Sequence, residues 1–135
     1  MATILCIDGD LRFLEAQKAL LEGRGYRVLI APNGATGIEI SRRQPVDAVV
    51  LDFKPPATDG DQVAAVLAKE QPNLPVAISS DCPDDMPESL KWFADALLEK
   101  GTAPEALLLA IEKLIAVRST TEKAAGCEAV QKRTA

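Results

Sequence analysis

Polar residues suited to phosphate and metal chemistry follow four apolar segments of this sequence. Asp8 and Asp10 come after one such segment, Asp52 after a second, and Ser80 and Lys100 after two others. The carboxyl ends of parallel strands meet at one edge of an open sheet, where ligands bind in such folds. Carboxylate oxygens suit Mg²⁺, which is held by one or two carboxylates together with phosphate oxygens. The pattern predicts a site for a divalent cation and a phosphoryl group.

The four segments belong to a longer alternation of β-rich and helical patterns. Three of the β-rich segments are nearly continuous apolar runs, as expected for strands that are covered on both faces. Such alternation predicts βαβ units around a parallel sheet, which is the α/β class. The expected strands are residues 3–7, 26–30, 47–51, 75–79 and 95–98. The expected helices are residues 11–23, 34–43, 60–70 and 87–93, with a fifth that begins near residue 102.

The first and last of these helices have clear apolar faces. In residues 11–23 one face collects Phe13, Leu14, Gln17, Leu20 and Leu21. Asp10 stands where an N-cap belongs, and Gly25 follows where the helix should stop. In the last helix Leu109 points away from the apolar face, so we expect it to be exposed.

Length, composition and charge limit the class of protein. A chain of 135 residues that is 47% hydrophobic fits one compact domain. A net charge of −5 without clustered basic residues argues against a nucleic-acid partner, and no apolar run approaches the roughly 18 residues of a membrane span. Cys6, Cys82 and Cys127 are too widely spaced for a disulfide framework or a zinc site, and we expect Cys6 to be buried. The chain has no histidine, so it is no phosphohistidine donor, and we expect a cytoplasmic protein without a membrane partner.

Two of the motifs around the carboxylates resemble the receiver domain of bacterial two-component response regulators. Residues 4–10, ILCIDGD, resemble the strand that ends in acidic residues in that family. Residues 49–60, VVLDFKPPATDG, have the phosphoacceptor aspartate of the family, here Asp52, with a proline and an Asp-Gly pair at the same spacing.

Two later motifs extend the resemblance, which covers about residues 3–117. Ser80 lies five residues after Pro75, as does the hydroxyl residue of the family. Ala94 and Asp95 before the last strand, and Lys100 after it, are also similar to the family pattern. The order of the four motifs makes the resemblance more specific than any one of them.

The resemblance implies a role for each residue of the predicted site. Asp52 would be the nucleophile that takes the phosphoryl group, while Ser80 and Lys100 would contact its oxygens. Mg²⁺ would be held by Asp8, Asp52 and the backbone carbonyl of Lys54, with Asp10 as a further candidate ligand. The chain would be no enzyme beyond Mg²⁺-dependent phosphorylation of itself from a donor and its own dephosphorylation.

The resemblance also implies an architecture and partners. The fold would be a flavodoxin-like, doubly wound sheet of five parallel strands in the order 2-1-3-4-5, with five helices. Residues 1–118 would form the receiver domain, followed by a disordered or partly helical tail, 119–135. A histidine kinase or phosphotransfer protein would donate the phosphoryl group, and a downstream protein would read it. The face of the fourth helix, fifth strand and fifth helix is a candidate homodimer surface.

Two alternatives belong to other classes. A degenerate receiver-like scaffold would bind a partner without phosphorylation. Gly9 in place of a second acidic residue, Asp81 in place of a small residue and Leu97 in place of an aromatic one favour this alternative. A haloacid-dehalogenase-like phosphatase would use the Asp-x-Asp spacing of Asp8 and Asp10, but this interpretation leaves the segment around Asp52 unexplained.

Overall fold

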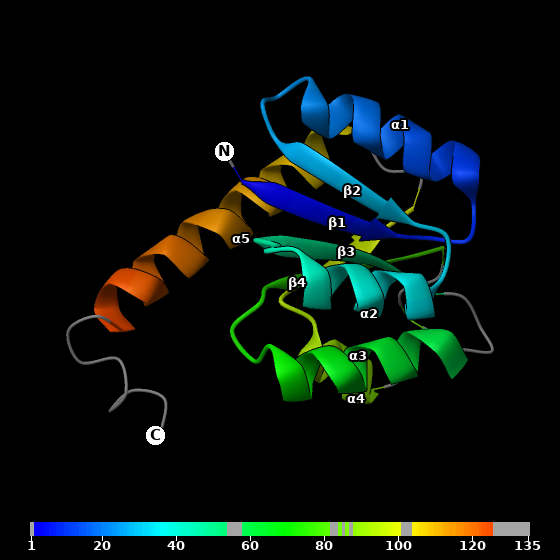
Figure 1. Ribbon diagram of the computed structural model, residues 1–135. Coiled ribbons are helices and arrows are strands. Elements are labelled where there is room, and N and C mark those ends of the chain that lie inside the picture. Colours follow the sequence, from blue (N-terminus) through cyan, green and yellow to red (C-terminus); the bar gives the residue numbers. More distant parts are fainter. Residues whose placement is uncertain are drawn as a thin grey trace.

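Five parallel strands form one sheet between two layers of helices (Figure 1). The computed structural model describes residues 2–53, 58–81, 84, 86, 88–100 and 104–125, and only the backbone of residues 58–61, 104 and 117–125. The strands are β1 (Thr3–Ile7), β2 (Arg27–Ala31), β3 (Ala48–Phe53), β4 (Val76–Ser80) and β5 (Ala96–Glu99). The helices are α1 (Leu11–Glu22), α2 (Gly34–Arg43), α3 (Thr58–Glu70), α4 (Glu88–Phe93) and α5 (Pro104–Ala125).

The strand order is β2-β1-β3-β4-β5, as the resemblance to the receiver family implied, and every neighbouring pair is parallel. The predicted strand and helix bounds differ from the observed ones by one or two residues, except at the end of α5. This helix continues to Ala125, so part of the expected tail is helical, and residues 126–135 lie outside the described part of the chain.

Two apolar clusters fill the space above and below the sheet. On one face the odd-numbered residues of β1 and β3, such as Leu5 and Val49, pack with α2, α3 and α4. On the other face, here called the α1/α5 face, Cys6 and Val50 pack with α1 and α5. Alternate residues of a strand point to opposite faces, so this division fixes the face of every later residue in each strand.

The helix α2 lies unusually close to β1. A Cβ atom at Gly37 would overlap the side chain of Ile7, so glycine is needed for this close approach. The turn after α1 needs a second glycine, because Gly25 has a φ of +93°. Gly37 thus lies against the end of β1, while Gly25 lies in the turn that leads into β2 beside the start of β1.

Several expectations about single residues are confirmed. Leu14, Gln17 and Leu21 of α1 are buried, and Asp10 is its N-cap. Cys6 is fully buried and Leu109 is exposed, whereas Cys82 and Cys127 lie outside the described residues. In the part of the chain that the structure describes, no helix is long and apolar enough to cross a membrane.

Candidate functional site

Two carboxylates occupy neighbouring positions at the carboxyl edge of the sheet, on the right in Figure 1. Asp8 follows β1 and Asp52 is near the end of β3, which are adjacent strands. Ile7 is in register with Leu51, so the next pair along the two strands is Asp8 and Asp52. Both continue the alternation that places Cys6 and Val50 on the α1/α5 face. Their side chains are almost completely buried, with 2% and 5% exposed.

A lysine from a third strand joins the two carboxylates. The Nζ atom of Lys100 lies 2.8 Å from Oδ2 of Asp8 and 2.8 Å from Oδ1 of Asp52. Lys100 follows β5, and β4 lies between β5 and β3 in the sheet. The lysine side chain therefore crosses the end of β4 to reach both carboxylates. The backbone N–H of Lys100 donates to the carbonyl oxygen of Ser80 at 2.8 Å, which fixes the start of this crossing.

The lysine is charged and largely shielded from solvent. Burial alone would lower the pKa of Lys100, but the hydrogen bonds that it donates to Asp52 and Asp8 outweigh burial and hold this pKa above its ordinary value. The ammonium group also lies 4.6 Å from the centre of the Phe13 ring, within the range of a cation–π contact. Phe13 comes from α1, so the lysine crosses β4 on the α1/α5 face.

Asp8 is oriented by contacts to both of its oxygens. Its Oδ1 accepts a hydrogen bond from the backbone N–H of Asp10 at 2.8 Å, while Oδ2 contacts Lys100. The charge of Asp8 also affects Cys6 in the preceding strand, β1. Burial, with a smaller contribution from Asp8, raises the pKa of the Cys6 thiol to about 12.

Asp10 and Gly9 differ from the two buried carboxylates. Oδ1 of Asp10 accepts from the backbone N–H groups of Arg12 and Phe13, at 3.0 and 3.3 Å, and so caps α1. Both Asp10 and Gly9 are exposed. A Cβ atom at Gly9 would meet only the carbonyl oxygen of Pro32, at 4.0 Å, so a larger side chain has room there.

The two serines at the end of β4 lie on opposite faces of the strand. Ser80 is in register with Phe53, on the face of α2, α3 and α4, and it is 1% exposed. Ser79 is in register with Asp52, on the α1/α5 face, and it is 4% exposed. The sequence singled out Ser80 and gave Ser79 no role.

The carboxylates of Asp8 and Asp52 fit the smallest usual set of protein ligands for Mg²⁺. No group of three or more His, Cys, Asp or Glu side chains gathers among the described residues. Asp8 and Asp52 nevertheless converge on one point, because both contact the same Nζ atom. One or two carboxylates with water and phosphate oxygens are the usual ligands of Mg²⁺ in phosphoryl-transfer sites. Lys54, whose backbone carbonyl was the third expected ligand, lies outside the described residues.

The remaining departures from the family pattern are on the surface. Asp81 is exposed, directly after the end of β4. Leu97 of β5 is 42% exposed and belongs to the face opposite Lys100. Two features of the site were not predicted. The first is the contact of Phe13 with Lys100, because Phe13 was assigned only to an apolar helix face. The second is the pairing of Ser79 with Asp52, because the register of β3 and β4 was unknown.

Comparison with known proteins agrees with this geometry. A sequence model of the response regulator receiver domain matches residues 4–112, so the chain belongs to the response regulator receiver family of two-component systems. This family assignment takes away the support for the phosphatase alternative. Protein PilH of Pseudomonas aeruginosa is 32% identical over 120 residues, which are 86% of this chain and 99% of PilH.

Other relatives are longer than this chain. The transcriptional regulatory protein GlrR of Escherichia coli is 36% identical over 77 residues, which are 57% of this chain but 17% of GlrR. Response regulator MprA of Mycobacterium leprae is 32% identical over 114 residues, half of its own length. The chain thus spans only part of several curated relatives that it matches.

Solved structures show the same fold. A CheY-like receiver domain protein from Methanospirillum hungatei has a TM-score of 0.80 and 25% identity, covering 89% of this chain and 98% of its own. Response regulator TrrA of Thermotoga maritima, solved in complex with Mg(2+)-BeF, has a TM-score of 0.75 and 25% identity, covering 84% of this chain and 99% of its own. The flavodoxin-like fold expected from the sequence is confirmed.

Proposed function

We propose that this chain is a working phosphoacceptor receiver that takes a phosphoryl group on Asp52. The observation that carries the proposal is the contact of Lys100 with both Asp8 and Asp52 at a buried sheet edge. Two acidic residues and one cation at a single point provide a nucleophile, a second anionic ligand and a charge for the incoming group.

The chemistry follows from these three side chains. A carboxylate oxygen of Asp52 attacks the phosphorus atom of a phosphohistidine or small-molecule donor, and the bond from phosphorus to the donor breaks with its electron pair on the donor. Lys100 moves from the carboxylates to the phosphoryl oxygens and stabilises their charge. Ser80, one residue beyond Ser79, donates its hydroxyl hydrogen to another phosphoryl oxygen.

Receiver domains typically bind Mg²⁺ at the phosphorylation site, and Asp8 and Asp52 are the residues that would hold it here. The backbone carbonyl of Lys54 is a further candidate ligand, as is Oδ2 of Asp10, the carboxylate oxygen that does not cap α1. When bound, the ion neutralises negative charge on the transferring phosphoryl group. Because Gly9 contributes no carboxylate, we expect weaker Mg²⁺ binding than in a receiver with two acidic residues after β1.

The partners follow from the same proposal. Receiver domains are signalling modules that interact with histidine kinases or phosphotransfer proteins, and a cytoplasmic protein of this kind would be the donor. We place the output surface on α4, β5 and α5, which each expose a large apolar residue: Trp92 is 85%, Leu97 42% and Leu109 52% exposed. This surface would contact a downstream protein or a second copy of the chain, and no nucleic acid or membrane.

The experiment that tests phosphorylation is the intact mass of the protein after incubation with Mg²⁺ and acetyl phosphate. We expect a gain of one phosphoryl group that is absent from Asp52→Asn and from a chelated sample. Asp47→Asn is a matched control, because Asp47 directly precedes β3 and so lies at the opposite end of the strand from Asp52. No gain, while a receiver of known activity is modified in parallel, would refute the proposal.

The degenerate scaffold is the second candidate, because Gly9 supplies no carboxylate where the family has a second acidic residue. Since the site has room for a side chain there, Gly9→Asp adds the missing carboxylate without a clash. If the chain is a receiver, Gly9→Asp should raise Mg²⁺ affinity by roughly tenfold, since affinity follows the number of charged ligands. A scaffold would show no measurable Mg²⁺ binding by calorimetry before the change.

A further inference from the structure

The hydroxyl group of Ser79 is buried beside Asp52 and has no hydrogen-bond partner among the described residues. Buried hydroxyl groups in folded proteins are almost always hydrogen-bonded, because an unmet donor loses its water without compensation. Ser41, a buried serine of α2, donates by contrast to the carbonyl oxygen of Ile38 at 2.7 Å. The hydroxyl group of Ser79 is therefore a hydrogen-bond donor at the carboxyl edge of the sheet that has no acceptor among the described residues.

The position of Ser79 relative to the phosphoacceptor is fixed by the sheet. Asp52 and Ser79 are paired in the register of β3 and β4, and neighbouring strands are about 4.8 Å apart. Val49 with Val76 and Leu51 with Ile78 are the register pairs on the opposite face. Alternation therefore puts the side chains of Asp52 and Ser79 on the same α1/α5 face.

The lysine of the site passes over this serine. Lys100 crosses the end of β4 on the α1/α5 face, as its contact with Phe13 shows. Ser79 is the residue of β4 that is level with Asp52, so it lies beneath this crossing. The side chain of Ser79 is buried, with 4% exposed.

We propose that Ser79 is a positioning residue whose hydroxyl donates a hydrogen bond to the Asp52 carboxyl group once Lys100 has moved to the phosphoryl oxygens. The inference rests on the proposed phosphorylation of Asp52. In the acyl phosphate one carboxyl oxygen of Asp52 is bonded to phosphorus and the other is a carbonyl oxygen. Ser79 is a neighbouring donor with unused capacity on the same face of the sheet.

This hydrogen bond favours the loss of the phosphoryl group. During hydrolysis a water molecule attacks phosphorus, and the bond from phosphorus to the Asp52 oxygen breaks with its electron pair on the carboxylate. The protons of the water end on the released phosphate and in solvent. Negative charge grows on the carboxyl group as it leaves, so a donor to that group is stronger in the transition state than in the acyl phosphate. Ser79 thus shortens the lifetime of the phosphorylated state.

The experiment measures the decay of phosphorylated protein by intact mass after removal of acetyl phosphate. Ser79→Thr and Ser79→Val form a pair of equal shape that differs in the hydroxyl, and Ser79→Ala removes the group without adding volume. We expect decay about as fast as the wild type in Ser79→Thr, and roughly tenfold slower in Ser79→Ala and Ser79→Val, the loss of one hydrogen bond to a charged group. Ser41→Ala is the control for loss of a buried serine away from the site.

A purely structural role predicts a different result. Removal of an unpartnered buried hydroxyl should leave thermal stability unchanged or higher in Ser79→Ala, with no change in decay. Equal decay rates in the wild type, Ser79→Thr and Ser79→Val would overturn the inference while Asp52 phosphorylation stands. Slow decay in Ser79→Thr as well as Ser79→Val would also overturn it, because packing would then be the cause. No phosphoryl group on any of these proteins would refute the proposed function itself.

Discussion

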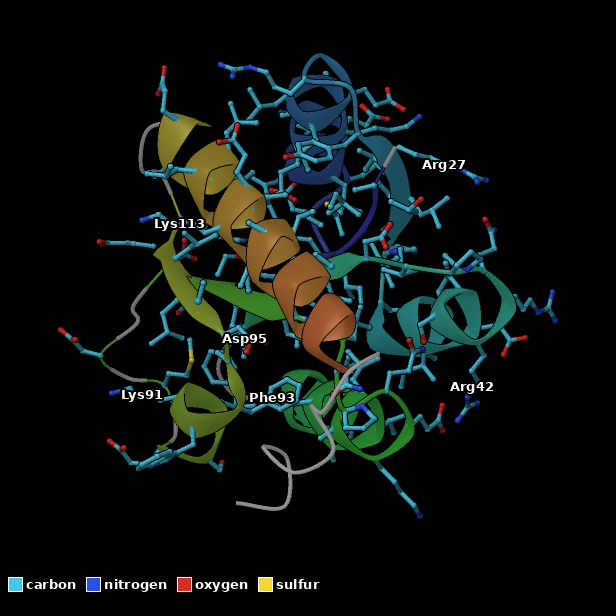
Figure 2. All side chains as sticks on the ribbon, turned by 90° about the vertical axis from the view of Figure 1, so that its left-hand side faces the viewer. Arg27, Arg42, Lys91, Phe93, Asp95 and Lys113 are labelled. Atoms are coloured by element: carbon cyan, nitrogen blue, oxygen red, sulfur yellow. The ribbon has the colours of Figure 1, made fainter. Side chains whose placement is uncertain are left out.

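The two edges of the sheet use aspartates in opposite ways. At the amino edge, toward the viewer in Figure 2, Asp95 lies before β5, and Asp47 lies before β3. Oδ2 of Asp95 accepts from the backbone N–H of Val76 at 2.8 Å, and the N–H of Asp95 donates to the carbonyl oxygen of Val76. Asp47 makes the same reciprocal pair with Thr3, at 2.7 and 2.8 Å.

At the carboxyl edge the charges face one another instead. Asp8 and Asp52 both contact the ammonium group of Lys100, and their side chains are buried. The amino edge joins strands with backbone hydrogen bonds that need no other charge. The difference teaches that an aspartate at a strand end is structural where it accepts from the backbone N–H of a neighbouring strand, and available for chemistry where it shares a cation with a second carboxylate.

The largest effect should come from removing the shared cation. Lys100→Met leaves two buried carboxylates without their common partner, and we expect the free energy of unfolding at pH 7 to fall by roughly 3 kcal/mol. The double variant Lys100→Met with Asp8→Asn should recover part of this loss, because one of the two charges is gone. Urea denaturation measures both. A loss no larger than that of the control Lys113→Met, at an exposed lysine of α5, would show that Lys100 contributes no net stability.

A smaller effect should come from the amino edge. Asp95→Ala or Asp47→Ala leaves one strand N–H without its carboxylate, which should cost about 1–3 kcal/mol of unfolding free energy. Neither variant should change the gain of a phosphoryl group measured by mass at a temperature where it is folded. Loss of phosphorylation in a fully folded Asp95→Ala protein would contradict the separation of the two edges.

The smallest effect concerns Cys6, which lies between the edges. The pKa of this thiol is raised from 9.0 to about 12 in the folded protein, so the unfolded chain loses this proton first. The contribution of the protonated thiol to the free energy of unfolding is therefore complete below pH 9, and it is lost as the pH rises from 9 to about 12. Between pH 7 and pH 10 the wild type should lose about 1.4 kcal/mol more than Cys6→Val. Equal losses in denaturation experiments at the two pH values would show that burial does not hold the thiol protonated.

Much of this architecture could be predicted from local patterns. The apolar runs of β1, β3 and β4 and the capped, amphipathic α1 are properties of consecutive residues, and their predicted bounds were within one or two residues. The predicted contribution of Asp52, Ser80 and Lys100 to one edge followed from strand ends in a parallel sheet. The order of the strands came from resemblance to the family, and the structure confirms it.

The contacts across the sheet could not be predicted, because they depend on register. A shift of one residue between β3 and β4 would pair Asp52 with Ser80 instead of Ser79 and reverse the faces of the two serines. Likewise, the contact of Phe13 with Lys100 depends on where α1 lies over the sheet, which its periodicity does not determine. Asp10 was expected both as a cap and as a candidate ligand, and the structure shows the cap.

The exposed ring of Trp92 gives the protein an optical reporter. It is the single tryptophan of the chain and is 85% exposed on α4, so its emission in the free protein should already resemble that of an indole in water. Unfolding should therefore change the fluorescence little, and circular dichroism is the better signal for denaturation. A blue shift of the emission on mixing with another protein would instead report directly that α4 has been covered, without any added label.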